Sequence, residues 1–210
     1  MGIEYFKLPI FDRRPYCDPA EWAQRYRYMK TTASMFSFEQ SPYFELPNQV
    51  MGDLAGTACV VLKVPSQTGK TETLINMLGW IVEYDRANTL LIMDTKTSGI
   101  ALSKNRIRPF LRDVCGLDYS KTASSKGKDN DHSMNAVDLG IGRGANVKIG
   151  SSRCAGDLCS TPVKYLLMDE LDRWQQEIRG EGDPISLAFQ RQLRFRGMTV
   201  MCSTPTLEDG

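Results

Sequence analysis

The six residues Ser66-Gln67-Thr68-Gly69-Lys70-Thr71 constrain this chain more than any others, because of what stands on either side of them. The run before them, residues 58–64, is almost uniformly apolar and predicts a buried strand. In the run after them, residues 71–84, one stripe at helical spacing is formed by Leu74, Ile75, Leu78, Ile81 and Val82. A strand, a loop with glycine and an amphipathic helix, in this order, are the surroundings that a phosphate-binding loop requires.

The loop also has the residue types that bind a nucleotide phosphate. Successive backbone N–H groups and the helix N-terminus form a hollow of anion size. Lys70 adds a positive charge toward the β- and γ-phosphates, and the Thr71 hydroxyl can ligate Mg²⁺. The usual loop begins with a glycine five residues before Gly69, where this chain has Val64, so the loop is a variant. The alternative is a Gly-Lys-Thr that only caps a helix in a surface turn.

A second motif is the apolar run 163–168, which ends in two carboxylates, Asp169 and Glu170. Phosphoryl transfer needs one group that holds Mg²⁺ and one that orients the attacking water. We expect Asp169 to hold the ion through water and Glu170 to orient and polarise the attacking water. A strand that ends in a solvated acidic turn is the alternative, and the nearby phosphate loop makes it less favourable.

A third motif is the apolar run 198–202, which ends in the small hydroxyl residues Ser203 and Thr204. In a parallel sheet these residues would lie beside the nucleotide, where they could sense the γ-phosphate. An ordinary turn at a strand end explains the same residues. By itself this motif is therefore weak.

Apolar strands alternate with helical segments from residue 57 onward. Further strands are predicted at 89–93 and 146–149, and a second helical stretch ends near Val114, with Gly116 as a stop. This rhythm predicts an α/β fold whose mostly parallel central sheet is flanked by helices. We expect the strand at 58–64 to be central. The stretch from about 120 to 144 is polar and rich in glycine and lysine, and no strand is predicted there.

The first fifty residues lack a long apolar strand and predict an N-terminal arm, followed by an ATPase domain over 51–210. Within the arm, Asp18 is a capping residue, Pro19 stands at the first helical position and Glu21 could reach back to the cap. These signals predict a short helix that ends near Met29.

The net charge of the 210-residue chain is +1, so any contact with nucleic acid must come from local basic runs. Three such runs are residues 104–108 with Arg112, residues 121–128, and residues 191–196. Each could bind phosphates, and each could equally be a solvated face. No targeting or membrane-spanning segment is evident in the sequence.

Together these motifs resemble the large terminase subunit of lambda-type tailed phages, over roughly residues 40 to 206. The resemblance includes Ser41-Pro42-Tyr43 with Glu45 and Pro47, and the loop 66–72. Its most specific part is the run 166–173, followed by Gly180-Glu181-Gly182-Asp183-Pro184 and Arg191. Ser203-Thr204-Pro205 resembles the family's segment that couples hydrolysis to DNA movement.

The resemblance implies a P-loop NTPase of the ASCE type, which hydrolyses Mg-ATP to move double-stranded DNA into a procapsid. The ATP-binding residues would then be Ser66, Gln67, Thr68, Gly69, Lys70, Thr71 and Glu72. The catalytic residues would be Lys70 and Glu170, with Thr71 and Asp169 at the metal, and Ser203 and Thr204 in coupling. Two alternative functions remain. One is a helicase-like ATPase that depends on nucleic acid, and the other is an ATP-binding assembly module that does not hydrolyse ATP.

Partners follow from the same resemblance. They are double-stranded DNA, the small terminase subunit and the portal protein. The assembled chain is expected to form a ring of subunits in the host cytoplasm, and no membrane partner is expected. The family's nuclease domain is missing from the sequence, so no nuclease activity is expected. The loop has no arginine of its own, and the charge-stabilising arginine is expected at Arg153, at Arg191 or in a neighbouring subunit.

Overall fold

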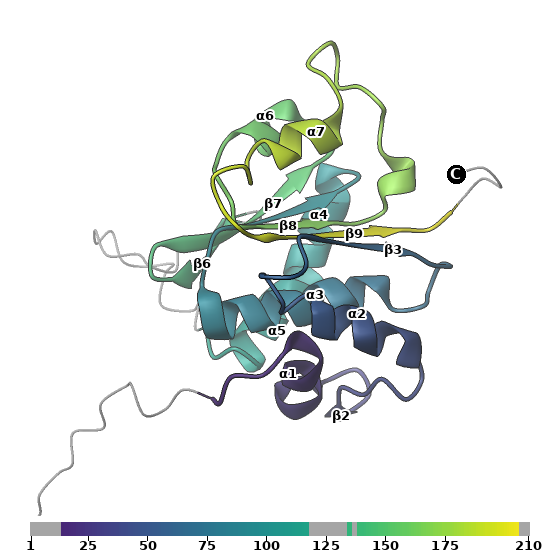
Figure 1. Cartoon of the computed structure of the whole chain (residues 1–210), viewed down its shortest axis with the longest axis vertical. Coiled ribbons are helices and arrows are strands. Elements are labelled where there is room, and N and C mark those ends of the chain that lie inside the picture. Colours follow the sequence, from purple (N-terminus) through teal and green to yellow (C-terminus); the bar gives the residue numbers. More distant parts are fainter. Residues whose placement is uncertain (1–13, 118–133, 136–137, 206–210) are drawn as a thin grey trace, which may run out of the picture.

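The computed structural model describes residues 14–117, 134–135 and 138–205 (Figure 1). A seven-stranded sheet crosses the middle of the molecule, in the order β3-β9-β8-β4-β7-β6-β5. Its strands are β3 (Cys59–Lys63), β4 (Thr89–Met93), β5 (Met134–Asn135), β6 (Asp138–Gly142), β7 (Ala145–Ser151), β8 (Tyr165–Met168) and β9 (Met198–Ser203). The first five in spatial order are parallel, while β6 and β5 are antiparallel to their neighbours. The predicted α/β fold with a mostly parallel sheet is confirmed.

Helices cover both faces of the sheet, as Figure 1 shows. Helices α6 and α7 lie above it, and α3 and α5 lie below it, with α1 and α2 farther out. The α-helices are α1 (Pro19–Tyr26), α2 (Glu45–Val50), α3 (Lys70–Trp80), α4 (Lys96–Leu102), α5 (Arg108–Asp113), α6 (Ala155–Cys159) and α7 (Pro184–Phe189). Two π-helical turns, η3 (Ile81–Asp85) and η4 (Ser103–Ile107), continue α3 and α4, and two 3-10 turns are η2 (Pro42–Phe44) and η6 (Leu171–Arg173).

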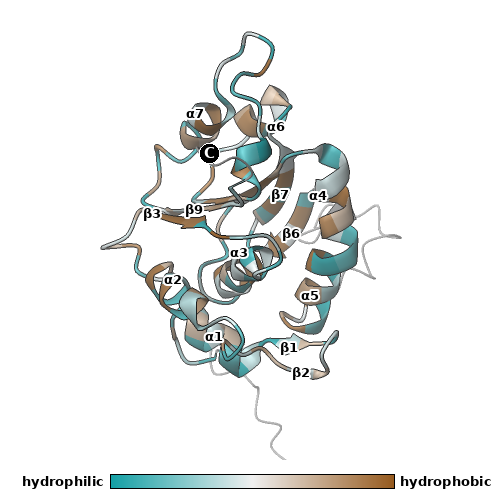
Figure 2. Ribbon diagram, turned by 90° about the vertical axis from the view of Figure 1, so that its right-hand side faces the viewer, coloured by the Kyte–Doolittle hydropathy of each residue, from teal (hydrophilic) through white to brown (hydrophobic). Residues whose placement is uncertain are grey.

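Successive residues of the central strands point to opposite faces and so fill two separate cores. On β4, Leu91 packs with Leu74 and Leu78 of α3, whereas Leu90 and Ile92 pack toward α6 and α7. All five residues of β4 are buried, which explains the uninterrupted apolar run in the sequence. Figure 2 shows the same division, with hydrophobic strands inside and helices α4 and α5 carrying a hydrophobic and a hydrophilic side.

Strand β3 is at the edge of the sheet, so the prediction of a central strand was wrong. Of its five residues only Leu62 is buried, and Val61 is 64% exposed. An apolar run shows that a segment favours a sheet, but the place of the strand depends on which other strands pair with it. Here β9, which comes last in the chain, lies between β3 and β8.

Strand β6 and the hairpin that it forms with β7 were also not predicted. The two strands are joined by Arg143 and Gly144, both at positive φ, as a two-residue hairpin turn requires. Leu139 and Ile141 are buried while three glycines flank or interrupt the run, so the alternation is hard to recognise in the sequence. Strand β7 is longer than predicted, and β8 begins at Tyr165 rather than at 163.

Helix α1 begins as predicted, with the Asp18 side chain accepting from the Glu21 N–H at 2.9 Å. The Glu21 carboxylate pairs with Arg25 one turn later rather than with the cap. The helix ends at Tyr26, not near Met29, because Tyr28 and Met29 form β1, which pairs with β2 (Ser34–Met35). The resulting arm packs on α3 and adds Trp22 and Ala23 to the core below the sheet.

Candidate functional site

The loop between β3 and α3 has the backbone shape of an anion-binding turn. Gln67 and Gly69 are both at positive φ, at 59° and 102°. Gly69 is the residue before the helix, and its carbonyl accepts from the N–H groups of Glu72 at 3.0 Å and Thr73 at 3.3 Å. Glycine adopts this φ without steric cost, and the backbone N–H groups of Lys70 and Thr71, the first two residues of the helix, lie at the helix end that faces a ligand.

Val64, at the position of the usual first glycine, continues the sheet. Its N–H donates to the carbonyl of Ser203 at 3.1 Å, so the loop proper begins at Pro65. The Thr68 hydroxyl closes the loop by donating to the Pro65 carbonyl at 2.8 Å. The variant loop is therefore shorter at its strand end and fixed by its own side chain.

The Lys70 ammonium is buried at the base of the loop, with the residue 8% exposed. It donates to the Pro65 carbonyl at 3.0 Å and to the Thr204 hydroxyl. Both acceptors are neutral, so a phosphate oxygen would be a stronger partner for the same charge. The structure thus brings Lys70 and Thr204, predicted from separate motifs, into direct contact.

Thr71 and Asp169 meet where α3 begins and β8 ends. The Thr71 hydroxyl donates to Asp169 Oδ2 at 2.9 Å, and the Glu170 N–H donates to Asp169 Oδ1 at 3.0 Å. Asp169 is 2% exposed, and this burial raises the pKa of its carboxyl, while the Thr71 and Glu170 donors and the charges of Lys70 and Arg106 oppose the rise. A buried carboxylate beside a hydroxyl is the oxygen donor set that Mg²⁺ prefers, so these residues fit the ion.

Glu170 follows directly and has left-handed backbone geometry, with φ at 56°. This conformation is uncommon for a residue other than glycine and recurs at functional sites. The Glu170 carboxylate lies 3.6 Å from Arg173 Nη1, and the Glu170 residue lines the same pocket as the loop.

Ser203 and Thr204 link the loop to the segment after Glu170. The Ser203 hydroxyl donates to Asp172 Oδ1 at 2.9 Å and accepts from the Asp172 N–H at 3.0 Å. The Thr204 N–H donates to the same Asp172 oxygen at 3.3 Å. Because β9 lies between β3 and β8, its end is in contact with both halves of the site.

A pocket of about 360 Å³ lies among these groups. Its lining residues are Ser66, Gln67, Gly69, Lys70, Thr71, Glu72, Arg106, Asp169, Glu170, Arg173 and Thr204. Of the predicted residues, Thr68 and Ser203 do not line it; Thr68 lines a neighbouring pocket of about 410 Å³ between the loop and the arm.

Arg106 and Arg173 are the pocket residues that the sequence did not assign to the site. Arg106 belongs to a run predicted only as a possible DNA contact, and no motif spacing connects it to the loop. The two arginines named instead lie elsewhere: Arg153 pairs with Asp94 at 2.9 Å, and Arg191 donates to the Cys159 carbonyl at 3.1 Å. Neither lines the pocket.

Of the other basic runs, the structure describes only the run 191–196. Arg196 donates to the Ala55 carbonyl at 2.9 Å, and Leu193 between the arginines is 81% exposed. The run 121–128 lies outside the described residues. Within the parts of the chain that the structure describes, no helix has the length and apolar character needed to cross a membrane.

The fold and the pocket define an α/β protein with a nucleotide-sized site at the ends of parallel strands. Residues 31–210 match the family model of the phage terminase large subunit gpA, ATPase domain. This match covers well over half of the chain, so the chain belongs to that family, as the resemblance predicted. The family is one of ATP-hydrolysing domains that serve phage DNA packaging. No curated protein matches the chain.

Proposed function

We propose that this chain hydrolyses Mg-ATP in the 360 Å³ pocket and that the energy moves double-stranded DNA into a procapsid. The observation that carries the proposal is the meeting of Lys70, the Thr71–Asp169 pair and Glu170 around one pocket. These groups come from two segments that are 98 positions apart in the sequence. Their convergence supports a single catalytic site rather than separate capping and surface turns.

Each group has a distinct task in the proposed reaction. The N–H groups of the loop 66–71 bind the phosphates, and Lys70 exchanges the Thr204 hydroxyl for a phosphate oxygen. Thr71 and Asp169 hold Mg²⁺, which neutralises charge on the β- and γ-phosphates when bound. Glu170 orients and polarises the attacking water from the rim of the pocket.

The strand order supports the assignment to the ASCE type, in which an additional strand separates the phosphate loop from the catalytic glutamate. Strand β9 has that position between β3 and β8. We retain residues 1–50 as the arm and residues 51–210 as the ATPase domain. Glu72 belongs to the ATP-binding loop by this proposal, and it also pairs with Arg27 of the arm.

The Lys70–Thr204 contact supports a coupling role for Ser203 and Thr204. When a γ-phosphate takes over Lys70, Thr204 loses its charged partner while Ser203 keeps its bonds to Asp172. Nucleotide binding and hydrolysis thus change the hydrogen bonds that the end of β9 makes. The partners, namely duplex DNA, the small subunit, the portal and neighbouring subunits in a ring, follow from the family, with the host cytoplasm as the setting.

The proposal is tested by measuring ATP binding and hydrolysis in the wild type, Lys70→Ala and Glu170→Gln, with and without duplex DNA. Lys70→Ala should lose both binding and hydrolysis. Glu170→Gln should keep binding while kcat falls by about 10²- to 10⁴-fold. Lys96→Ala, which removes an exposed lysine outside the pocket and outside the basic runs, is the control. Wild-type rates in both site variants would refute the site.

A further inference from the structure

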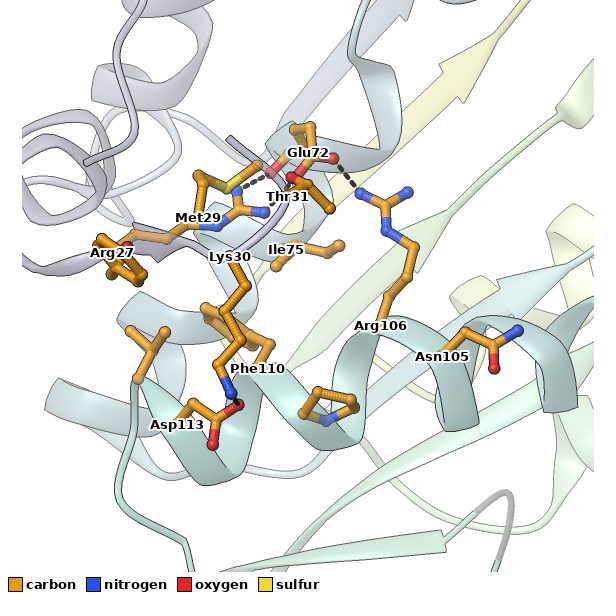
Figure 3. A pocket seen from close by; sticks show the side chains of 13 residues that line it. Arg27, Met29, Lys30, Thr31, Glu72, Ile75, Asn105, Arg106, Phe110 and Asp113 are labelled. Carbon is orange, nitrogen blue, oxygen red and sulfur yellow. Dashed lines mark hydrogen bonds and ion pairs between the residues drawn. The ribbon is translucent and has the colours of Figure 1, made fainter. Parts of the chain in front are cut away.

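Arg106 lies in a distorted part of its helix. The turn η4 (Ser103–Ile107) has π-helical bonding and separates α4 from α5. Single π-turns within helices are rare and are frequent at functional sites. From this turn the Arg106 side chain, 39% exposed, extends to α3 and pairs with Glu72 (Figure 3).

Glu72 is shared by two arginines, which Figure 3 shows on either side of it. Arg27 of the arm is buried and has several acceptors: the Glu72 carboxylate, the Glu72 carbonyl at 3.1 Å, and the Asn76 side chain. Within the described residues, Arg106 contacts no hydrogen-bond acceptor other than Glu72. The Arg106 guanidinium can therefore move away from Glu72 without leaving the Glu72 carboxylate unpaired, because Arg27 still pairs with it.

Arg106 also lines the phosphate pocket together with Lys70, Asp169 and Glu170. Arg173 lines the pocket too, but its guanidinium is paired with Glu170, the proposed water-orienting group. Moving Arg173 to a phosphate would uncouple that pair, whereas moving Arg106 leaves Glu72 paired with Arg27.

We propose that Arg106 is the catalytic arginine of this ATPase and that it acts within its own subunit. This inference rests on the proposed function. Arg106 leaves Glu72 and donates to the γ-phosphate oxygens as the water oxygen bonds to phosphorus. The bond from phosphorus to the β–γ bridging oxygen breaks, its electrons stay on ADP, and the water proton passes to Glu170 and then to the released phosphate. A planar guanidinium suits the spreading charge on the transferred group.

The test compares Arg106→Ala and Arg106→Lys with the wild type in three measurements without DNA. These are the affinity for ADP and a non-hydrolysable ATP analogue, the kcat for ATP, and the affinity for ADP with aluminium fluoride, which mimics the transferring phosphoryl group. We expect nucleotide affinity within about fivefold of wild type and kcat lower by about 10³-fold or more. The aluminium fluoride complex should be lost, and lysine should not restore it.

Two further variants make the test specific. Arg112→Ala removes an exposed arginine of α5 that pairs with Asp113 and does not line the pocket, and it should behave like the wild type. Arg173→Ala removes the competing arginine and should still form the aluminium fluoride complex. Loss of that complex in Arg173→Ala, with its retention in Arg106→Ala, would overturn the proposal.

Mixing experiments decide between action within and between subunits. An equimolar mixture of Arg106→Ala and Lys70→Ala chains should have no more activity than either alone. Recovery on mixing would mean that the arginine acts on a neighbouring subunit and would refute the proposal. Wild-type kcat in Arg106→Ala would also refute it and leave the proposed function intact, whereas a wild type that binds no ATP would overturn both.

Discussion

Helix α3 has two polar regions of opposite character. Its first turn faces the phosphate pocket, where Lys70 and Thr71 contact neutral or buried acceptors beside open space. Its outer side faces the arm, where Asn76 lies among Arg27 and Asn48 and is fully buried. In the arm contact most polar groups have a protein partner, including the Trp80 indole N–H, which donates to the Cys17 carbonyl at 2.8 Å, whereas the buried Trp22 indole N–H has none among the described residues.

The difference separates stability from chemistry along one helix. Buried polar groups that are fully paired with each other hold the arm in place and leave nothing for a ligand. Polar groups that border a pocket retain capacity for one. Substitutions on the arm side should therefore lower the free energy of unfolding and leave the pocket unaltered. Substitutions in the pocket should impair ATP hydrolysis without lowering the free energy of unfolding.

The largest effect on the arm side is expected from Trp22→Ala. Trp22 is fully buried on α1, and its ring lies edge-on to Phe110 at 6.2 Å between centroids. Removing it should lower the free energy of unfolding by about 3–5 kcal/mol, measured by urea denaturation. Tyr28→Ala, at a residue that is 50% exposed, is the control. A loss below about 1 kcal/mol would mean that the arm contributes little to stability.

A smaller loss, about 2–4 kcal/mol, is expected for Arg27→Met. Burial lowers the pKa of Arg27 and Glu72 opposes that shift, so the pair holds the charge in the core. The variant leaves the Asn76 side-chain oxygen without its donor, while Glu72 keeps Arg106. Arg25→Met on the preceding helix α1 breaks an exposed pair with Glu21 and should cost less than about 1 kcal/mol. Equal losses in the two variants would contradict the comparison.

Gly79→Ala tests how closely the arm packs on α3, because the expected effect on stability is opposite to the one that helix propensity predicts. Alanine favours a helix over glycine by about 1 kcal/mol, yet a Cβ here would clash with the Trp22 ring and lie 2.7 Å from Phe110 Cζ. We expect a net loss of about 1–3 kcal/mol. Gly156→Ala in α6 meets nothing closer than 3.9 Å and should not destabilise. In the double variant with Trp22→Ala the two losses should be less than additive.

The smallest effect, and one of opposite sign, is expected for Asp169→Asn on the pocket side. The pKa of Asp169 is raised by burial, so the folded state binds its proton more tightly than the unfolded state. The contribution of this carboxyl to the free energy of unfolding is fully present when the pH is below the pKa that the group has in the unfolded state. The contribution is lost as the pH rises through the pKa of the folded state. At pH 7 the variant should melt higher by about 2–4 °C for each kcal/mol regained.

The pH dependence of that gain is its control. The difference in Tm between the variant and the wild type should vanish as the pH falls below 3.8, the ordinary pKa of the group, where the wild-type carboxyl becomes protonated in both states. ATP hydrolysis should be lost at every pH, because the proposed ligand for Mg²⁺ is gone. A lower Tm at pH 7 would show that the pocket carboxylate stabilises the fold, against the division drawn above.

Local signals explain why much of the site could be predicted. The loop at Gly69, the strand ending at Asp169 and the one ending at Ser203 each have their function-bearing residues next to an apolar run. Because parallel strands end at one edge of a sheet, the alternating pattern itself brings these residues together. Val64 in place of glycine did not disturb the loop, since its N–H is used by the sheet.

The sequence by itself determined the alternation of strands and helices, and it predicted a phosphate loop at Gly69 and the paired carboxylates as a site, because each depends on neighbours along the chain. Only the tertiary structure decided that β3 is an edge strand and that Arg106, rather than Arg153 or Arg191, borders the pocket. It also decided that the arm shares Glu72 with Arg106. These facts depend on which distant segments pack together, and contacts across 34 or 45 positions leave no periodic trace in the sequence.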